Sequence, residues 1–412
     1  MSHAPLPPRS PLAARWTLNP ELVFLNHGSF GATPRAVQAA QSRYRDELES
    51  EPVAFFVERL FPLMDRVRQA LGRFVHADPA CIAPVPNATV GVATAFHNVR
   101  LAPGDEILVN DHEYPACLNN ARLVAARHGA SVVTAELPFP ITGPDAIYDA
   151  IMARVTPRTR VALISHITSS SGARLPVERL VPELHHRGVE TLIDGAHVPG
   201  HIPLDLAALR PTYYTANCHK WVCSPKGSAF LYVAPARRDG FRPVILSNNA
   251  ERPRPGRDNF FTEFDFVGTG DPTSILAIPD ALDEMASMLP GGWDAVRAAN
   301  HALLRQGRAT LCDALGIAPP IPESMLGCLC TLPLPAHAPD VQARVLARPS
   351  RRGYHDALQD ILLEKWKIQV PLWNVAGKTR VLRISAQLYN TPEQYQYLAR
   401  ALTEELAAEA RL

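Results

Sequence analysis

The chain has 412 residues, of which 47% are hydrophobic and 20% are charged, and its formal net charge is +1. This composition excludes a disordered or strongly basic chain, so we expect an enzyme-sized core and no nucleic-acid partner. No uninterrupted run of about 18 apolar residues is present, and no membrane span is expected. The 7 cysteines show no paired CxxC spacing, which indicates reduced thiols in the cytoplasm and no metal site.

The first elements of the chain predict an α/β domain. Residues 1–20 are rich in proline and polar side chains, and we expect a disordered lead there. From residue 21 to 275, short β-branched runs alternate with amphipathic stretches, which predicts a mostly parallel sheet covered by helices on both faces. The runs expected to form strands are 106–110, 131–137, 161–167, 191–196, 213–217 and 230–234.

The last third of the chain, residues 276–412, predicts a linker helix and a smaller α+β domain. Residues 272–315 are helix-rich, and the runs 326–334 and 381–389 are expected to be strands around a helix that begins near Tyr354. Cys328 and Cys330 lie inside the first of these runs, so we expect them in the core.

A lysine and an aspartate at the ends of two predicted strands indicate the chemistry. Lys220 lies between the run 213–217 and an apolar Trp-Val pair, and Asp194 ends the run before it. The alternatives are a surface lysine and a turn cap. Pyridoxal phosphate (PLP) requires a lysine that holds it as a Schiff base and a buried carboxylate that keeps its pyridine nitrogen protonated. The pair therefore predicts PLP as the cofactor.

Polar residues near other strand ends offer a site for the phosphate group. Asn87, Ala88 and Thr89 form a turn that enters a helical pattern, and free N–H groups at a helix N-terminus bind anions. Asn217 and His219, just before the lysine, are further candidates. An ordinary helix cap and strand-end polar residues are the alternatives.

Three side chains are candidates to contact the cofactor ring or its phenolic oxygen. Tyr114 follows the strand 106–110 and could stack on the ring, or it could be a loop tyrosine. Ser169 and His197 could bond the phenolic oxygen, or they could be satisfied locally within their loops.

Arg383 is the candidate substrate ligand. It lies in an otherwise apolar strand, and a guanidinium group binds a carboxylate through two parallel hydrogen bonds. An internal salt bridge is the alternative. The glycine-rich turn 25–34 either closes over the site or is only a turn.

The order of these motifs resembles that of class V aminotransferase-fold PLP enzymes, and most of all their isopenicillin N epimerase-like branch. The resemblance runs from about Leu25 to Thr391. It is carried by LNHGSFGATP, PNATVGVATA, NDHEYPA, SHITSSSGARLPV, DGAHVPG, ANCHKW, GTGDPT and RISAQLYNT.

The resemblance implies the PLP-dependent transferase fold type I and a role for each candidate. Lys220 and Asp194 would be catalytic, Tyr114 would stack on the ring, and Arg383 would bind the α-carboxylate of an amino-acid substrate. Thr269 would reach the phosphate of a neighbouring subunit in a homodimer with shared sites. The other implied ligands are Ala88, Thr89, Asn217 and His219 at the phosphate, Ser169 and His197 near the phenolic oxygen, and Asn26 and His27 in the substrate pocket.

Two departures narrow the reaction. The region that carries the sulfur-accepting cysteine of cysteine desulfurases, here 364–373, contains no cysteine, and Ser169 stands where those enzymes have Asn. The missing cysteine disfavours only desulfurase activity. Together with the resemblance to the isopenicillin N epimerase-like branch, it leads us to expect removal of the α-proton of an amino acid, followed by epimerisation. A C–S lyase is the alternative, and an aminotransferase or a catalytically silent fold homologue is less favoured.

Overall fold

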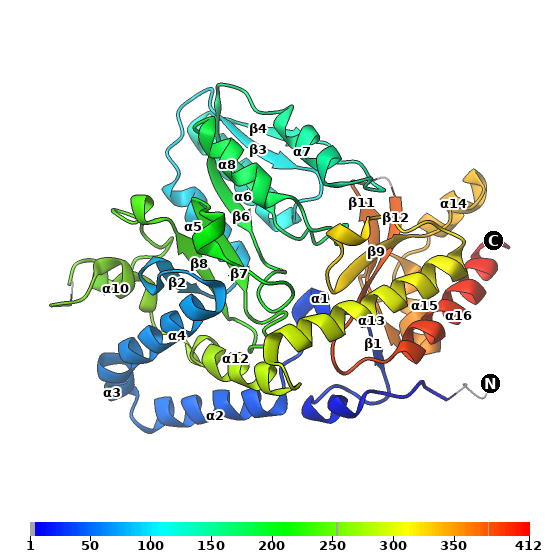
Figure 1. The fold of residues 1–412 in the computed structure, drawn as a ribbon, viewed down its shortest axis with the longest axis horizontal. Helices are drawn as coiled ribbons and strands as arrows, with labels where there is room; N and C mark the ends of the chain where they lie inside the picture. Colours follow the sequence, from blue (N-terminus) through cyan, green and yellow to red (C-terminus); the bar gives the residue numbers. More distant parts are fainter. Residues whose placement is uncertain (1–4, 253, 378) are drawn as a thin grey trace.

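The computed structural model describes residues 5–252, 254–377 and 379–412. Its largest element is a seven-stranded sheet in the order β2-β8-β7-β6-β5-β3-β4 (Figure 1). Strands β7, β6, β5, β3 and β4 are parallel, and β8 is antiparallel to both β7 and β2. The mostly parallel sheet expected from the sequence is confirmed. The strands are β2 (Ile82–Val85), β3 (Glu106–Asn110), β4 (Ser131–Ala135), β5 (Thr159–Ser165), β6 (Glu190–Asp194), β7 (Tyr213–Asn217) and β8 (Ala229–Val233).

Alternate residues of the central strands belong to different layers of the core. Ile107 and Val109 of β3 pack in one cluster with the helices α5 (Ala88–Asn98) and α6 (Pro115–His128). Leu108 packs in another cluster with α8 (Val177–His186). Side chains along a strand point to opposite faces, so a run that is apolar at every position requires cover on both sides.

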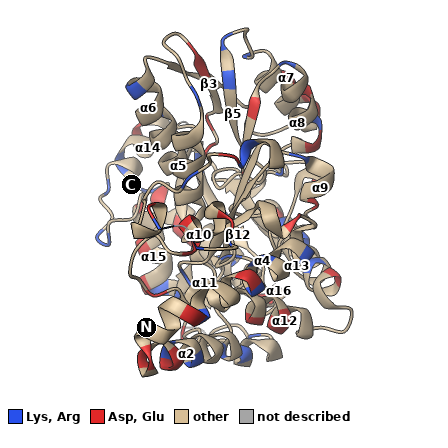
Figure 2. Ribbon diagram, turned by 90° about the vertical axis from the view of Figure 1, so that its left-hand side faces the viewer, with Lys and Arg blue, Asp and Glu red and all other residues tan. Residues whose placement is uncertain are grey.

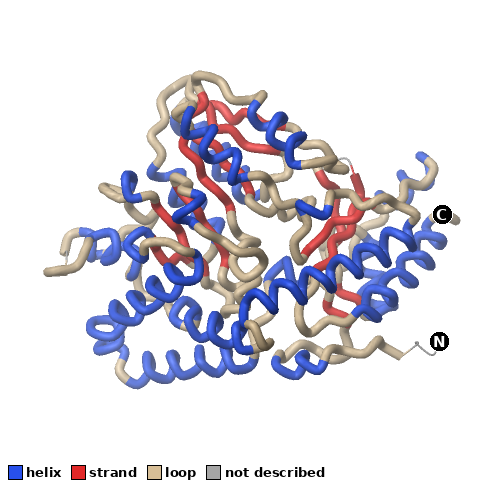
Figure 3. The backbone as a smooth tube through the Cα atoms, viewed as in Figure 1, coloured by secondary structure: helices blue, strands red, loops and turns tan. Residues whose placement is uncertain are grey.

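Further helices surround the large sheet (Figure 3). The short helical turns are η2 (Phe55–Arg59, a π turn), η3 (Pro79–Cys81), η4 (Pro235–Arg237), η5 (Asn248–Ala250) and η6 (Glu323–Met325). The other helices are α2 (Arg35–Ser50), α3 (Pro52–Ala54), α4 (Leu60–Val75), α7 (Pro144–Met152), α9 (Leu206–Leu209), α10 (Asn259–Asp265), α11 (Thr273–Leu276) and α12 (Ile278–Ser287).

A smaller α+β unit follows the long helix α13 (Gly292–Leu315), which runs along it in Figure 1. Its three-stranded antiparallel sheet has the order β11-β12-β9. The sequence predicted strands β9 and β12 and the helix α15 that lies between them in the chain. The elements are β9 (Leu329–Pro333), α14 (Pro339–Leu346), α15 (Ala357–Trp366), β10 (Ile368–Gln369), β11 (Leu372–Val375), β12 (Thr379–Ser385) and α16 (Pro392–Glu409).

The beginning of the chain packs against its end. Strand β1 (Val23–Phe24) forms a two-stranded parallel sheet with β10, and α1 (His27–Phe30) follows it. The N-terminal arm, assigned from sequence to the large domain, is therefore hydrogen-bonded to the small one.

The expected disorder of residues 1–20 is wrong for the part that the structure describes, which begins at residue 5. Residues Pro11–Arg15 form a 3-10 helix, η1, capped by Ser10. Trp16 is buried, its indole N–H donates to the carbonyl of Ala32 at 3.2 Å, and its ring lies 5.2 Å from that of Tyr389. The proline-rich composition suggested that the conformational entropy of this segment would keep it disordered. Burial of the Trp16 side chain offsets that entropy and orders the segment.

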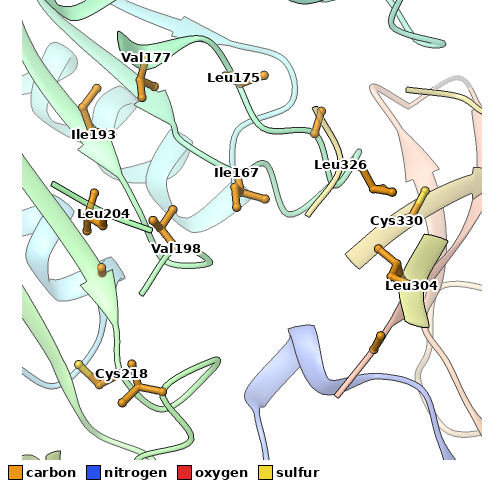
Figure 4. Close-up of a cluster of buried hydrophobic side chains, with 14 of the residues drawn as sticks. Ile167, Leu175, Val177, Ile193, Val198, Leu204, Cys218, Leu304, Leu326 and Cys330 are labelled. Atoms are coloured by element: carbon orange, nitrogen blue, oxygen red, sulfur yellow. The ribbon is translucent and has the colours of Figure 1, made fainter. Parts of the chain in front are cut away.

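One cluster of buried apolar side chains runs from the large sheet into the small domain. Figure 4 shows Ile193 and Leu204 on one side of it and Leu304 and Cys330 on the other. Charged residues of both signs are interspersed on outer helices such as α2 (Figure 2). Of the helices described, none is both long and apolar enough to cross a membrane.

Candidate active site

The site lies at the carboxyl ends of β6 and β7. Asp194 is the last residue of β6 and pairs with Thr215 of the neighbouring parallel strand β7. Lys220 follows the end of β7 in the same sequence segment. Adjacent parallel strands end at the same edge of a sheet, so these two functional groups share one edge, where α/β proteins bind their ligands.

Asp194 is a buried carboxylate without a cationic partner. Its Oδ1 accepts a hydrogen bond from the N–H of Ala196 at 2.9 Å, and its Oδ2 accepts one from the thiol of Cys117 at 3.3 Å. Among the described residues, no Lys, Arg or His side chain forms an ion pair with it. Burial raises the pKa of Asp194, because a charge in a low-dielectric interior needs compensation. A protonated ring nitrogen is a cation of the kind that this site lacks.

Lys220 contacts a histidine whose tautomer is set by a neighbour. Its Nζ lies 2.9 Å from Nε2 of His197, and the indole N–H of Trp221 lies 3.4 Å from His197 Nδ1. An indole only donates, so Nδ1 accepts and the ring proton is assigned to Nε2, which then faces an uncharged amine. Burial, and after it the Arg383 guanidinium, lowers the pKa of Lys220 to about 7. The lysine is therefore set to act as a nucleophile and a base near neutral pH.

The expected phosphate site lies at the N-terminus of α5. Asn87 caps this helix by accepting from the N–H of Val90, and Asn217 accepts from the N–H of Ala88 at 2.8 Å. The N–H of Thr89 has no acceptor in the described part of the chain, so it remains free for an anion. The side-chain oxygen of Asn217 thus holds the helix against the end of β7.

His219, two residues after Asn217, forms its hydrogen bond within the loop that carries the lysine. Its Nδ1 lies 3.1 Å from the carbonyl of Ser228, while burial lowers its pKa to about 4. The structure therefore places a neutral imidazole next to the lysine, with Nε2 as the nitrogen left for a ligand.

Arg383 is a buried guanidinium that meets no carboxylate in the described chain. Its Nη1 donates to the carbonyl of Ser169 at 2.8 Å and to its hydroxyl at 3.1 Å, and its Nη2 donates to the hydroxyl of Ser29 at 3.0 Å. Its Nε has no acceptor among the described residues, and burial lowers its pKa to about 10. The salt-bridge alternative is therefore not what the structure shows, and an anion can bind here.

Ser169 lies against this guanidinium in the structure. Both its carbonyl and its hydroxyl contact Arg383, whereas the sequence suggested that it would contact the phenolic oxygen of the cofactor. His197, the other candidate for that oxygen, is the one that faces the lysine.

Tyr114 is half-exposed and precedes α6. Because its side chain is 47% exposed, its ring is accessible to a ligand.

The turn 25–34 packs onto the lysine loop. His27 is buried, with Nδ1 2.8 Å from the hydroxyl of Tyr389 and Nε2 2.9 Å from the carbonyl of Lys220. Both ring nitrogens are occupied, so His27 positions the lysine backbone instead of binding substrate as expected. Gly31, at φ 72°, approaches so closely that a Cβ would lie 2.0 Å from the carbonyl of His219. Asn26 accepts from Ser29, which in turn contacts Arg383.

Two buried residues beneath the site were not predicted. Cys117 contacts Asp194, and Glu113 accepts from the N–H of Ser165 at 2.7 Å. Burial raises the pKa of Glu113 to about 8. Cys117 lies four residues before Ala121, so both are on the buried face of α6. This spacing predicts that Cys117 is buried, but it does not predict the contact with Asp194. Thr269, expected to serve a second subunit, lies on an exposed loop after α10.

The residues present fit PLP. An unpaired buried carboxylate matches a ring N–H cation, a free helix N–H matches a phosphate, and a lysine with lowered pKa matches an aldehyde. One ligand, PLP, can supply the cation, the phosphate and the aldehyde that these three groups match.

Comparison with known proteins agrees with this geometry. The profile of the aminotransferase class V family matches residues 23–398. Isopenicillin N epimerase of Streptomyces clavuligerus is 33% identical over 94% of this chain and 96% of its own length. A putative L-cysteine desulfhydrase 2 of Oryza sativa subsp. japonica is 29% identical over 93% of this chain and 84% of its own.

The fold is also that of a PLP-bound protein. The structure of a C-DES mutant with glycine covalently linked to the PLP cofactor has a TM-score of 0.78, is 20% identical, and is covered over 96% of this chain and 100% of that one. This likeness confirms the expected PLP-dependent fold type I. With the match along nearly all of its length, the chain belongs to the aminotransferase class V family of PLP-dependent enzymes.

Proposed function

We propose that the protein removes the α-proton of an amino-acid substrate and returns a proton to the opposite face, as an amino-acid epimerase. The observation that carries this proposal is the buried Arg383 guanidinium, which has hydroxyl and carbonyl partners but no carboxylate within the described chain. The similarity to isopenicillin N epimerase favours epimerisation among the reactions open to such a site.

The residues divide the work between ring and substrate. When bound, PLP supplies an electron-accepting ring that stabilises negative charge at the α-carbon. Asp194 pairs with the ring nitrogen and keeps a proton there. Lys220, whose pKa is lowered to about 7, takes the α-proton in its neutral amine form, and the Nε2–H of His197 orients that amine.

Arg383 binds the substrate's α-carboxylate. The hydroxyls of Ser29 and Ser169 hold the guanidinium in place from either end. A carboxylate that binds there can accept hydrogen bonds from the Arg383 guanidinium. It also neutralises a buried positive charge that is destabilising without a counterion.

Tyr114 is our proposed donor of the second proton. Its phenol is half-exposed, whereas both ring nitrogens of His27, the other candidate, already have partners. Replacing Tyr114 by Phe should leave α-proton removal intact and slow the change of configuration.

The cofactor assignment has a direct test. Borohydride reduction followed by peptide mass spectrometry should place the reduced cofactor on Lys220. Lys226, six positions along the same loop and hydrogen-bonded to Thr33, is the internal control. Modification of Lys226, or of no lysine, contradicts the proposal.

The reaction is tested with candidate amino acids in D₂O. An epimerase incorporates deuterium at the α-carbon and produces a mixture of configurations without a keto acid. NMR and chiral chromatography on the same samples measure both. Stoichiometric pyruvate, ammonia and a sulfur-containing product would show that the enzyme is a lyase instead.

C–S lysis is the second candidate, because the similar rice protein is described as an L-cysteine desulfhydrase. In that reaction Lys220 takes the same proton and the β-substituent leaves with the electron pair of the C–S bond. The two reactions therefore share the removal of the α-proton. They differ in the next step, which is return of a proton to the α-carbon in the epimerase and loss of the β-substituent in the lyase. Transamination is a third and less favoured outcome.

We also propose a homodimer with shared sites, in which Thr269 reaches the phosphate of the partner. Thr269 lies on an exposed loop, and large apolar side chains are exposed at Phe30 (73%), Val53 (78%) and Ile245 (63%). Exposed apolar side chains of this size favour a protein partner if they form one patch. Mixing Lys220→Ala and Thr269→Ala proteins tests both statements, since a mixed dimer regains one intact site only if the two residues act across the interface.

We propose a cytoplasmic location on the basis of the thiols. All 7 cysteines are free and buried, including Cys328 and Cys330. A reducing compartment maintains such thiols. Fractionation of the source cells with an antibody against the protein tests this location.

A further inference from the structure

The thiol of Cys117 is hydrogen-bonded to the carboxylate that the site offers to a ring nitrogen. Cys117 lies in the first turn of α6, is 1% exposed, and places its Sγ 3.3 Å from Oδ2 of Asp194. The other oxygen of Asp194 accepts from the N–H of Ala196 at 2.9 Å. The two donors therefore fix the plane of the carboxylate from two directions.

The chemistry of the neighbours keeps this thiol protonated. Burial raises the pKa of Cys117 well above its usual value, and the charges of Asp194 and Glu113 act in the same direction. A protonated thiol is a donor, and a weak one. Other buried thiols in the chain contact backbone carbonyls, as Cys330 does with Thr331 and Cys328 with His201.

We propose that Cys117 is a positioning residue that aims the carboxylate of Asp194 and sets its basicity. This inference rests on the proposed function, because it concerns the carboxylate assigned to the ring nitrogen. Oδ2 has two lone pairs, and one remains for a ring N–H when the thiol uses the other. A weak S–H donor leaves more negative charge on Oδ2 than an O–H donor does, so the ring nitrogen retains its proton more strongly.

Two substitutions at this position should act in opposite directions. Cys117→Ala removes the donor, so the pKa of Asp194 in the cofactor-free protein rises further. Cys117→Ser supplies a stronger donor, so that pKa falls. A purely structural role would shift both variants in the same direction, in proportion to lost packing.

The experiment measures both forms of the protein. In the cofactor-free form, ¹³C NMR of labelled aspartate follows the titration of Asp194. In the form loaded with ¹⁵N-labelled PLP, the ring-nitrogen shift reports how fully that nitrogen is protonated. Because only the N–H of Ala196 then holds the carboxylate in place, PLP binding should also weaken about 3- to 10-fold in Cys117→Ala, with a smaller change in Cys117→Ser.

Cys330→Ala and Cys330→Ser are the matched controls, since Cys330 is also buried but its thiol, within the described residues, is hydrogen-bonded to a backbone carbonyl and not to a carboxylate. These controls should leave both signals unchanged. Equal titrations in wild type and Cys117→Ala, or the same shift in the Cys330 variants, would overturn the inference. Failure of PLP to attach to Lys220 would overturn the proposed function alone, because the aspartate titration needs no cofactor.

Discussion

Strand β12 carries two buried arginines with opposite surroundings. Arg380 donates to Asp356 at 2.6 and 2.8 Å and to Glu409 at 2.8 and 3.0 Å. Although burial acts to lower it, its pKa is raised by these hydrogen bonds. Arg383, on the same strand, donates to hydroxyl and carbonyl oxygens and lies 5.0 Å from the centre of the Trp373 ring, but it meets no carboxylate among the described residues, and burial lowers its pKa.

The difference separates a structural charge from a functional one. A buried ion that is fully paired contributes to the fold, whereas a buried ion without a counterion is destabilising unless a ligand compensates it. Asp265, bound by Arg68 and Arg257, and the unpaired Asp194 repeat the same contrast in the large domain. Unpaired buried charges therefore mark this active site.

The largest expected effect is on stability, at the paired arginine. Arg380→Gln leaves the buried Glu409 and the partly buried Asp356 without this cation, which should cost about 3–5 kcal/mol of unfolding free energy. Chemical denaturation measures this cost. The kinetic constants of the remaining folded protein should change little, and a large loss of substrate affinity would break the contrast.

Arg383→Gln should produce the reverse pattern. We expect kcat/KM to fall about 100-fold through loss of charged hydrogen bonds to the substrate, with unchanged or improved stability. Arg383→Lys should recover only part of the loss, because an ammonium cannot bind a carboxylate through two parallel bonds. A collapse in melting temperature with unchanged KM would show that Arg383 is structural too.

Lys220 is a third ionisable group of the site, partly buried, that forms no ion pair among the described residues, and its pKa is lowered. Its neutral fraction increases as the pH rises through about 7, so the rate at which the cofactor-free protein captures PLP should increase about fivefold from pH 6 to 7, about tenfold from pH 6 to 8, and level off above pH 8. Stopped-flow absorbance measures this rate. A rate that keeps rising to pH 10 would indicate an ordinary, solvated lysine.

Trp221→Phe tests the smallest effect. Without the indole N–H, the tautomer of His197 is no longer fixed, and the midpoint of the same pH profile should rise by up to about one unit. Trp293→Phe is the control, because that indole donates only to the carbonyl of Leu282. Equal midpoints in wild type and Trp221→Phe would show that the Trp221 indole does not control the tautomer of His197.

Local sequence predicted the elements with strong patterns. Apolar β-branched runs predicted β3 to β8, and the strand-end positions of Asp194 and Lys220 brought them to one edge of the sheet. Strand β2 was missed because it is four residues long and contains Pro84, which is tolerated there since β2 lies at the edge of the sheet.

Contacts between distant segments could not be predicted from local pattern. Strand β1 has only two residues and exists because β10 pairs with it. The same limit explains His27, whose partners Lys220 and Tyr389 lie far along the chain, and Cys117, which resembles any buried thiol on a helix. Such roles depend on tertiary distances.

The pairing of β1 with β10 also constrains when the protein can mature during its synthesis. The N–H of Leu25 donates to the carbonyl of Gln369, and its carbonyl accepts from the N–H of Ser385, so the arm cannot dock in this way until residues 369–385 have left the ribosome. Until then the lysine loop lacks the contact from His27, and Arg383 has not yet been made. A nascent large domain can therefore form its sheet early, but the complete surroundings of Lys220 and Arg383 await synthesis of residues 368–385.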